Sequence, residues 1–485
     1  MFIDKSSGRR AKPSRRLDLS IRVLLILAAP ITIAAALLII PREGRMDGPR
    51  VYAIKDAQIV TGTGKTIAKG TVVFRDGLIT EVGESVKIPA DARVIDGAGM
   101  TVYPGLIDAF GTFGQTLPAT PQPATGGGRG AGARTIPASS TETAEQLHGD
   151  AAASAADQLK PDETGLEAAR TDGITTELIS PPQGIFAGQA SLIDLASANP
   201  SKMVVKTPIA LTVQFSTARG FGGGTYPVSL MGSVAFIRQT FYDAIHYRDE
   251  VKRFDHAKRG VERPEYDKKL AALLPALSGD LPVIFVANTD LDIRRALMIA
   301  DEFKLKPIIQ GATDGYRIAD MLGSRKIPVI VSLDFPKRQA DLPDDVDEPL
   351  RVLRERAEAP KCPAKLAAAG VKIAFASGKL KPDDFIANIR KAVESGLPKD
   401  AAVRALTIDA AEILGAAQEV GSIEKGKIAN ITVVSGDLFA KDCKVRHVFV
   451  DGDEVELKKP EPPGRRPEGM GARPGDIDVT DRRQQ

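Results

Sequence analysis

Polar side chains that can carry chemistry stand at the ends of several strand-length apolar runs in this 485-residue sequence. Two aspartates that share a site can do acid–base chemistry when their surroundings move their pKa values apart. An aspartate at the end of a strand can also simply stabilise a turn, so we assign no catalytic residue. We treat five of these residues as pocket candidates: Asp108, Asn288, Gln310, Asp334 and Ser377.

Histidine, the commonest metal ligand among side chains, occurs only four times. His148 borders a low-complexity stretch, His246 and His256 lie in a polar segment, and His447 lies inside a strand-like run. None of the four follows an apolar run of the barrel type described below. His246 and His256 are also ten residues apart, which is not the i, i+3 or i+4 spacing of neighbours on one helix face. We expect surface or packed histidines here, not metal ligands.

Three further features suggest chemistry but lack its requirements. The acidic stretch DLPDDVDEP, residues 341–349, has neither the spacing nor the glycine of a calcium loop, so we expect a solvated loop. The segment GFGGGTYP, residues 220–227, has no GK[ST] and therefore does not match a phosphate loop. Cys362 and Cys443 are far apart in sequence; a disulfide needs an oxidising compartment, and two unpaired cysteines are the simpler expectation.

The composition is that of an ordinary globular chain. Hydrophobic residues make up 43% and charged residues 26% of the sequence. The formal net charge is +3, which gives no sign of the concentrated basic face that nucleic-acid binding requires. The length is sufficient for two domains with a large core.

The amino-terminal segment predicts a membrane anchor. Residues 23–40, VLLILAAPITIAAALLII, contain no charge, and seven basic residues precede them. A helix of 18 residues comes close to the thickness of the hydrocarbon core, and the basic flank keeps residues 1–22 in the cytoplasm. We therefore expect a single-pass protein of the inner membrane with its main domain outside the cytoplasm. The alternative is a cleaved signal peptide and a secreted protein.

Both ends of the remaining chain predict strands. Residues 51–100 alternate apolar and polar side chains, and Asp76-Gly77 is a two-residue hairpin signal. Residues 415–457 return to the same pattern. We expect one small composite β-sandwich domain built from these two segments.

The region between them, residues 101–414, predicts an α/β barrel. Apolar runs of strand length alternate with helical patterns, which indicates a parallel sheet covered by helices. A TIM-like (β/α)₈ barrel fits this length better than an open sheet. The runs are GITTELIS, VVKTPIAL, PVIFVAN, KPIIQG, IPVIVS and VKIAFAS. Residues 115–148 predict a low-complexity insertion and residues 458–485 a disordered tail, because neither buries enough apolar area to order itself.

Several segments resemble the amidohydrolase superfamily, and within it the imidazolonepropionase-like group. They occur in the superfamily's order over nearly the whole chain after the anchor. The segments are RDGLITEVG, VIDGAGMTVYPGLID, GITTELISPPQG, KLAAAGVKIAFASG, RALTIDAAEILG and VGSIEKGKIANITVVSGD. The resemblance implies a hydrolase of carbon–nitrogen bonds other than peptide bonds, with zinc or another divalent metal at the carboxyl ends of the barrel strands.

The same resemblance shows where the metal ligands would stand. The two histidines after strand 1 fall on Phe110 and Thr112, and the aspartate after strand 8 falls on Gly378. The histidines after strands 5 and 6 fall at or next to Asn288 and Gln310. The ligand after strand 4 has no clear counterpart, with Lys206 a loose candidate.

These substitutions remove the chemistry that the resemblance implies. Phe and Gly offer no ligand atom, and Thr, Asn and Gln offer neutral oxygens that bind transition metals weakly. The missing aspartate is also the usual general base. We therefore expect no metal cofactor and a binding or scaffold protein with an unknown small-molecule ligand, which is able to form a homodimer. The alternative is an active amidohydrolase that acts on cyclic amides or N-acyl compounds through an atypical metal site.

Overall fold

The computed structural model describes residues 50–115, 144–217, 226–257, 259–338, 342–343, 346–378, 380 and 382–457. The predicted anchor, most of the predicted insertion and the predicted tail lie outside these residues. The chain divides into two compact units, Met1–Pro49 and Arg50–Gln485, and the description below concerns the second. Among the described helices, none combines the length and the apolar character that crossing a membrane requires.

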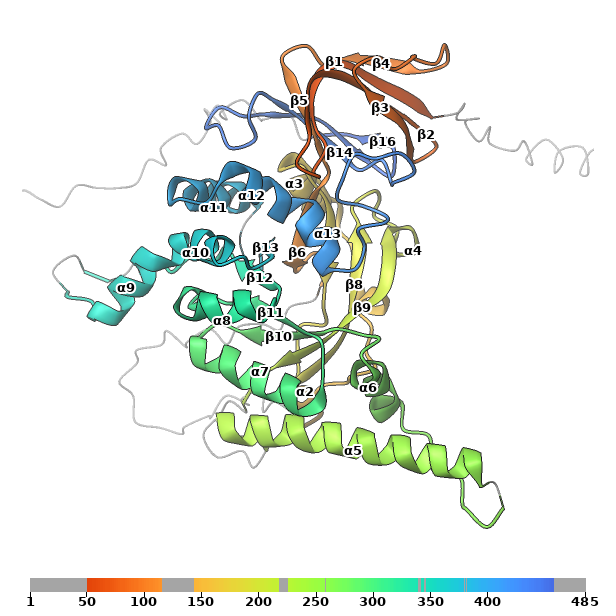
Figure 1. The fold of residues 1–485 in the computed structure, drawn as a ribbon, viewed down its shortest axis with the longest axis vertical. Coiled ribbons are helices and arrows are strands. Elements are labelled where there is room, and N and C mark those ends of the chain that lie inside the picture. The colour runs from red at the N-terminus through yellow and green to blue at the C-terminus, as the bar shows by residue number, and fades with distance from the viewer. Residues whose placement is uncertain are drawn as a thin grey trace, which may run out of the picture. The chain divides into compact units, whose positions relative to one another are not determined.

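Strands from both ends of the described chain form one eight-stranded sheet, shown at the top of Figure 1. Its order is β16-β15-β14-β5-β1-β2-β3, with β4 paired to β1. The sheet is thus composite, but its strands bond as one continuous sheet, whereas we expected two stacked sheets. The strands are β1 (Val51–Val60), β2 (Thr66–Arg75), β3 (Leu78–Gly83), β4 (Arg93–Asp96), β5 (Met100–Pro104), β14 (Ile431–Ser435), β15 (Val445–Val450) and β16 (Asp453–Val455).

The predicted hairpin between β2 and β3 is present. Asp76 and Gly77 have φ values of 49° and 84°, the positive values that a primed two-residue turn requires. The turn sets the antiparallel register in which Phe74 pairs with Ile79. Both side chains are buried, and the Phe74 ring packs 4.9 Å from the ring of Phe449 on β15. The apolar side chains of the strands from both ends of the described chain therefore pack into a single core.

A second eight-stranded sheet forms the nearly closed barrel that the βα alternation predicts. Its strands follow chain order around the ring, and β13 returns to lie beside β6. They are β6 (Leu106–Gly111), β7 (Ile174–Ile179), β8 (Phe186–Asp194), β9 (Val204–Gln214), β10 (Val283–Ala287), β11 (Pro307–Gly311), β12 (Val329–Ser332) and β13 (Ile373–Ala376).

One strand corrects the expectation of an all-parallel barrel. β8 runs antiparallel to both β7 and β9, while the other neighbouring pairs are parallel. Residues 180–185 alone connect β7 to β8, which is too short for the crossover that a parallel pair needs. β8 escaped sequence analysis because Gly188 and Gln189 interrupt its apolar pattern.

Helices cover the outer face of the barrel, and several of them begin at residues suited to capping them. Thr289 accepts the backbone N–H of Asp292 at the start of α7, and Ser229 accepts that of Gly232 at the start of α5. The helices are α2 (Ala144–His148), α3 (Glu163–Thr171), α4 (Pro200–Met203), α5 (Leu230–His256), α6 (Lys268–Ser278), α7 (Asp290–Phe303), α8 (Ala319–Ser324), α9 (Leu350–Glu358), α10 (Cys362–Ala368), α11 (Pro382–Glu394), α12 (Lys399–Leu406) and α13 (Ile408–Ile413).

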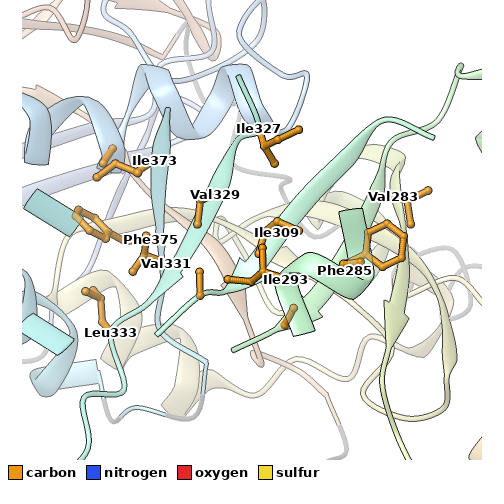
Figure 2. Packing of buried hydrophobic residues seen from close by; sticks show 14 of the residues in the cluster. Val283, Phe285, Ile293, Ile309, Ile327, Val329, Val331, Leu333, Ile373 and Phe375 are labelled. Atoms are coloured by element: carbon orange, nitrogen blue, oxygen red, sulfur yellow. The ribbon is translucent and has the colours of Figure 1, made fainter. Parts of the chain in front are cut away.

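Two apolar cores sandwich the barrel sheet. The outer one lies between strands and helices, and Figure 2 shows alternate side chains of β10 to β13 in it, including Phe285, Ile309, Val331 and Phe375. The inner core fills the lumen with side chains from six or more strands and is closed by α13 and the residues after it. Its members include Ile107, Leu178, Leu192, Ile209, Ile284, Ile308, Ile330, Ala374, Ala411, Ile413 and Val420. As in other barrels of this size, the lumen is packed and is not a pore.

The two cysteines are both free. Cys362 is buried at the start of α10, where its Sγ donates to the carbonyl oxygen of Ala312, and Cys443 is half-buried. Burial raises the pKa of the Cys362 thiol to about 12. The simpler expectation of two unpaired cysteines therefore agrees with the structure.

Gly149 is a testable point of close approach in the barrel. Its φ is 79°, and a Cβ at this position would lie 2.2 Å from the carbonyl oxygen of Phe186 at the start of β8. Gly64 has a similar φ of 89° but open space around it. The left-handed conformation alone costs an alanine about 1–2 kcal/mol.

We therefore expect Gly149→Ala to lower the free energy of unfolding by clearly more than the matched control Gly64→Ala, as measured by urea titration. If both variants lose the same free energy of unfolding, the backbone at Phe186 moves aside to admit the Cβ without an energetic cost.

Candidate functional site at the carboxyl ends of the barrel strands

The carboxyl ends of β6, β7 and β9 to β13 meet at one rim, where barrels of this kind carry their sites. Gln214, Val286, Gln310, Ile330 and Ala374 are register partners on successive strands and so form one layer. Ile330 and Ala374 belong to the lumen core, so Gln310 faces the lumen with them. Its side chain is 8% exposed.

Phe110, Thr112 and Gly378 lie together where β6 meets β13. The Phe110 side chain packs against the lumen core. The backbone N–H of Gly378 donates to the Phe110 carbonyl at 3.2 Å, and the Thr112 hydroxyl donates to the Gly378 carbonyl at 3.1 Å. We call these contacts the β6–β13 seam. The positions that the resemblance assigns to three metal ligands are therefore bonded to one another.

Asn288 follows β10 and is exposed at the rim. Its carbonyl accepts the Asp314 N–H at 3.0 Å and the Thr313 hydroxyl at 3.2 Å. A Cβ on Gly311 would lie 2.2 Å from Asn288 Oδ1, so the amide side chain rests on the end of β11. Asn288 thus shapes the β10 and β11 loops.

Two possibilities that the sequence left open for charged residues are not realised in the described structure. Asp334 is exposed, and its backbone N–H bonds the Ser332 hydroxyl, whereas Asp108 is 1% exposed; the structure does not pair them. Lys206 lies at the amino end of β9, opposite the rim, with its Nζ 3.7 Å from Glu419. The residue at the carboxyl end of β9 is Gln214.

Asp108 instead has a partner that sequence reasoning missed. It stands directly opposite Glu177 in the parallel β6–β7 ladder. Asp108 Oδ1 accepts the backbone N–H groups of Phe110 at 3.1 Å and Ser377 at 3.0 Å, and Glu177 Oε1 accepts that of Phe113 at 2.8 Å. We call Asp108 and Glu177 the carboxyl pair. The signal for it was a lone glutamate inside the apolar run GITTELIS.

Burial governs the charge of the carboxyl pair. Glu177 is 4% exposed, and burial followed by repulsion from Asp108 raises its pKa well above the usual range. Burial also raises the pKa of Asp108, against the hydrogen bonds from Ser377 and Phe110. Two buried neighbouring carboxyls cannot both ionise cheaply. Their contacts with three rim amides make them positioning groups, since they are too buried to reach a substrate.

The residues at the rim do not fit a catalytic metal. Such a site needs three strong ligands and an open position. The positions that the resemblance assigns to ligands offer a phenyl ring, a glycine, a hydroxyl committed to the Gly378 carbonyl, and neutral amides. Within the described part of the chain, no three His, Cys, Asp or Glu side chains gather closely enough to hold an ion.

The histidines lie elsewhere, as expected. His148 bonds the Tyr226 carbonyl, and its ring stacks 4.2 Å from that of Phe236. His246 lies 3.2 Å from Glu250 on α5, and His447 lies 2.7 Å from Glu454 in the composite sheet. His256 is exposed at the end of α5. Each has a surface or packing role.

Two clefts on the described surface have no pocket candidate among their lining residues. One of about 590 Å³ lies beside the β7–β8 turn and is lined by residues that include Glu145, Asp150, Gln183 and Lys269. The other, of about 770 Å³, lies in the composite sheet near Lys65 and Glu424.

The carboxyl pair makes folding stability depend on pH. Glu177 keeps its proton in the folded chain at pH values where the unfolded chain has released it. Its stabilising contribution is therefore complete below the unfolded pKa and is lost as pH rises through the folded pKa. Glu177→Gln keeps an acceptor for Phe113 but cannot ionise.

We expect the melting temperature of Glu177→Gln to exceed that of the wild type by roughly 2–4 °C at pH 9 and to match it at pH 5, by differential scanning calorimetry. The exposed control Glu81→Gln should show the same small difference at both pH values. A Glu177→Gln difference independent of pH would mean that Glu177 is charged throughout.

The fold and several sequence segments have known relatives. The Amidohydrolase family model matches residues 328–455. An amidohydrolase from Thermotoga maritima MSB8 of known structure is 26% identical, with a TM-score of 0.69 over 84% of this chain and 100% of that chain. A 5-methylthioadenosine/S-adenosylhomocysteine deaminase of Pyrococcus furiosus is 45% identical over 56 residues, and a dihydroorotase of Anaeromyxobacter dehalogenans is 40% identical over 58 residues.

Each of these two curated relatives aligns over 12% of this chain and only 13% of its own length. They therefore mark a shared segment, while the similarity to the Thermotoga structure extends over 84% of this chain. The family match falls on the last barrel strands and the returning strands of the composite sheet, where three of the six resembling segments also lie. Residues 328–455 of this chain thus match the amidohydrolase family, and the described fold is similar to that of a solved amidohydrolase.

Proposed function

We propose that this chain is a non-catalytic member of the superfamily's imidazolonepropionase-like group, and that it acts by binding a ligand or partner. The observation that carries the proposal is the β6–β13 seam. Residues at three ligand positions satisfy one another there, so their polar groups are already used. A metal would have to compete with the Thr112–Gly378 bond to gain one hydroxyl.

The remaining polar groups do not replace the lost metal. Hydrolysis of an amide needs an activated water and stabilisation of the charge on the carbonyl oxygen. The carboxyl pair is buried beneath the rim, and Asn288 and Gln310 are neutral. A rim with hydrogen-bonding amides and no activated nucleophile is suited to binding a ligand and not to hydrolysing it.

We further propose that the barrel is held at the inner membrane by residues 23–40, with residues 1–22 in the cytoplasm and the barrel outside it. The uncharged run and its basic flank support this. Protease treatment of intact spheroplasts should digest the barrel and spare an amino-terminal tag. A digested tag with a protected barrel would show the reverse orientation.

An active hydrolase of cyclic amides or N-acyl compounds is the second candidate. The match to a deaminase and a dihydroorotase favours it, because both relatives are named for enzymatic reactions. It requires a metal held by residues outside the family pattern, and metal content therefore separates the two candidates.

The test is the metal content of the full-length chain after incubation with zinc and manganese, measured by mass spectrometry. We expect less than roughly 0.1 ion per chain, since neutral oxygens bind these ions weakly. A variant carrying Phe110→His, Thr112→His and Gly378→Asp serves as the positive control. It supplies three ligands at the seam and should retain more zinc than the wild type. Gly378 has a φ of 59°, which aspartate tolerates better than most residues.

Stoichiometric metal in the wild-type chain, together with turnover of lactams or N-acyl amino acids, would overturn the proposal. Metal lost on Asp334→Ala would locate the rebuilt site. Absence of both metal and turnover is the expected result.

A further inference from the structure

A polar joint links the composite sheet to the amino end of the barrel. Asn430, 5% exposed at the start of β14, donates from Nδ2 to Thr176 Oγ1 at 3.0 Å and to Asp194 Oδ2 at 3.1 Å. Its Oδ1 accepts the backbone N–H of Asp451 at 2.8 Å, and its carbonyl accepts that of Gly105 at 2.7 Å. We call these five residues the floor joint. One amide side chain thus ties β7 and β8 to β14 and to the β15–β16 turn.

Asp194 is the unusual member of the floor joint. It is 4% exposed and ends β8 opposite Thr176. Its Oδ2 accepts from Asn430, but Oδ1 is buried and has no hydrogen-bond partner among the described residues. An ionised carboxylate with a bare buried oxygen is costly, because water is excluded and no donor replaces it. The neutral acid avoids most of that cost.

The charges around Asp194 do not reverse this preference. Arg170 of α3 is the positive group that faces it, but its Nε donates to the Leu195 carbonyl at 2.7 Å, and Glu163 and Glu167 share its charge. Asp451 faces Asp194 from the β15–β16 turn with a negative charge. The contributions of β7 and β14 are Thr176 and Asn430, which are neutral. Burial is the largest cause and raises the pKa of Asp194 to about 7.

We propose that the floor joint is a pH-dependent link, in which Asp194 holds the barrel to the composite sheet as a neutral acid and loosens that hold when its proton passes to solvent. The device is independent of the rim and of any catalytic activity.

The sign of the effect follows from linkage. The unfolded chain releases this proton near the ordinary value of 3.8, whereas the folded chain keeps it up to about 7. Stability from Asp194 is therefore complete below pH 3.8, declines as pH rises between these values, and is gone above the upper one. A carboxylate in a salt bridge behaves in the opposite way.

The test compares unfolding of the full-length wild type and Asp194→Asn across pH. Asn is isosteric, keeps an oxygen for Asn430 and cannot ionise. We expect the ratio of unfolding constants, wild type over variant, to rise by about tenfold per pH unit between pH 5 and 6.5 and to level off above about pH 7.5. Asp437→Asn is the matched control. Its carboxylate pairs with Lys399, which contributes to a lowered pKa, so its ratio should stay flat over this range.

A second measurement covers the case in which Asp194→Asn does not fold. Hydrogen exchange of the Asp451 and Gly105 amides reports on the floor joint in the unaltered chain. After correction for intrinsic exchange, we expect their protection to fall between pH 5 and 8, by at least as much as that of the Ile309 amide in β11, which reports on unfolding of the barrel core. A flat wild-type to Asp194→Asn ratio, or equal protection at pH 5 and 8, overturns the proposal.

Discussion

Closure of the barrel along the β6–β13 seam is the constraint on which the described fold depends. The first and last barrel strands meet without a regular ladder, so a few specific bonds must hold them together. The Gly378 N–H donates to the Phe110 carbonyl, the Thr112 hydroxyl donates to the Gly378 carbonyl, and Asp108 accepts the Ser377 amide. In a hydrolase of this superfamily the resemblance places a metal at this junction. Here hydrogen bonds between protein groups join the residues at the corresponding positions.

The carboxyl pair shows how such a junction remains specific. Glu177 receives the Phe113 amide and lies so close to Gly111 that a Cβ there would come within 1.9 Å of its Oε1. The chain leaving β6 is thus fixed by packing and by hydrogen bonds to two neighbouring strands. A buried acid is an expensive way to satisfy these amides, because its charge must be suppressed. Its geometric benefit is that a single side chain reaches donors that the strand ladder cannot.

Much of this architecture was predictable from local patterns. Apolar runs bounded by helical patterns predicted the barrel, and Asp76-Gly77 predicted the hairpin that starts the composite sheet. The reversal of β8 was not predictable from apolar content, since direction depends on the length of the connection and Gly188 hides the strand. The carboxyl pair was missed for a different reason: Glu177 looks like one polar residue in an apolar run, and only the register places it opposite Asp108. The exposure of Asp334 and the position of Lys206 were also missed. Both depend on where a residue lies relative to the ends of its strand, which apolar runs do not reveal.

The composite sheet has a consequence for how the chain folds during its synthesis on the ribosome. β1 and β2 are made first, yet their sheet needs β14, β15 and β16, which are made almost last. Arg50 and Asp453, more than four hundred residues apart, are bonded across the finished sheet. The early strands must therefore wait, with unpaired edges, until the whole barrel has been synthesised. The order of synthesis and the order of assembly are opposed in this chain, and its aggregation risk is greatest during that interval.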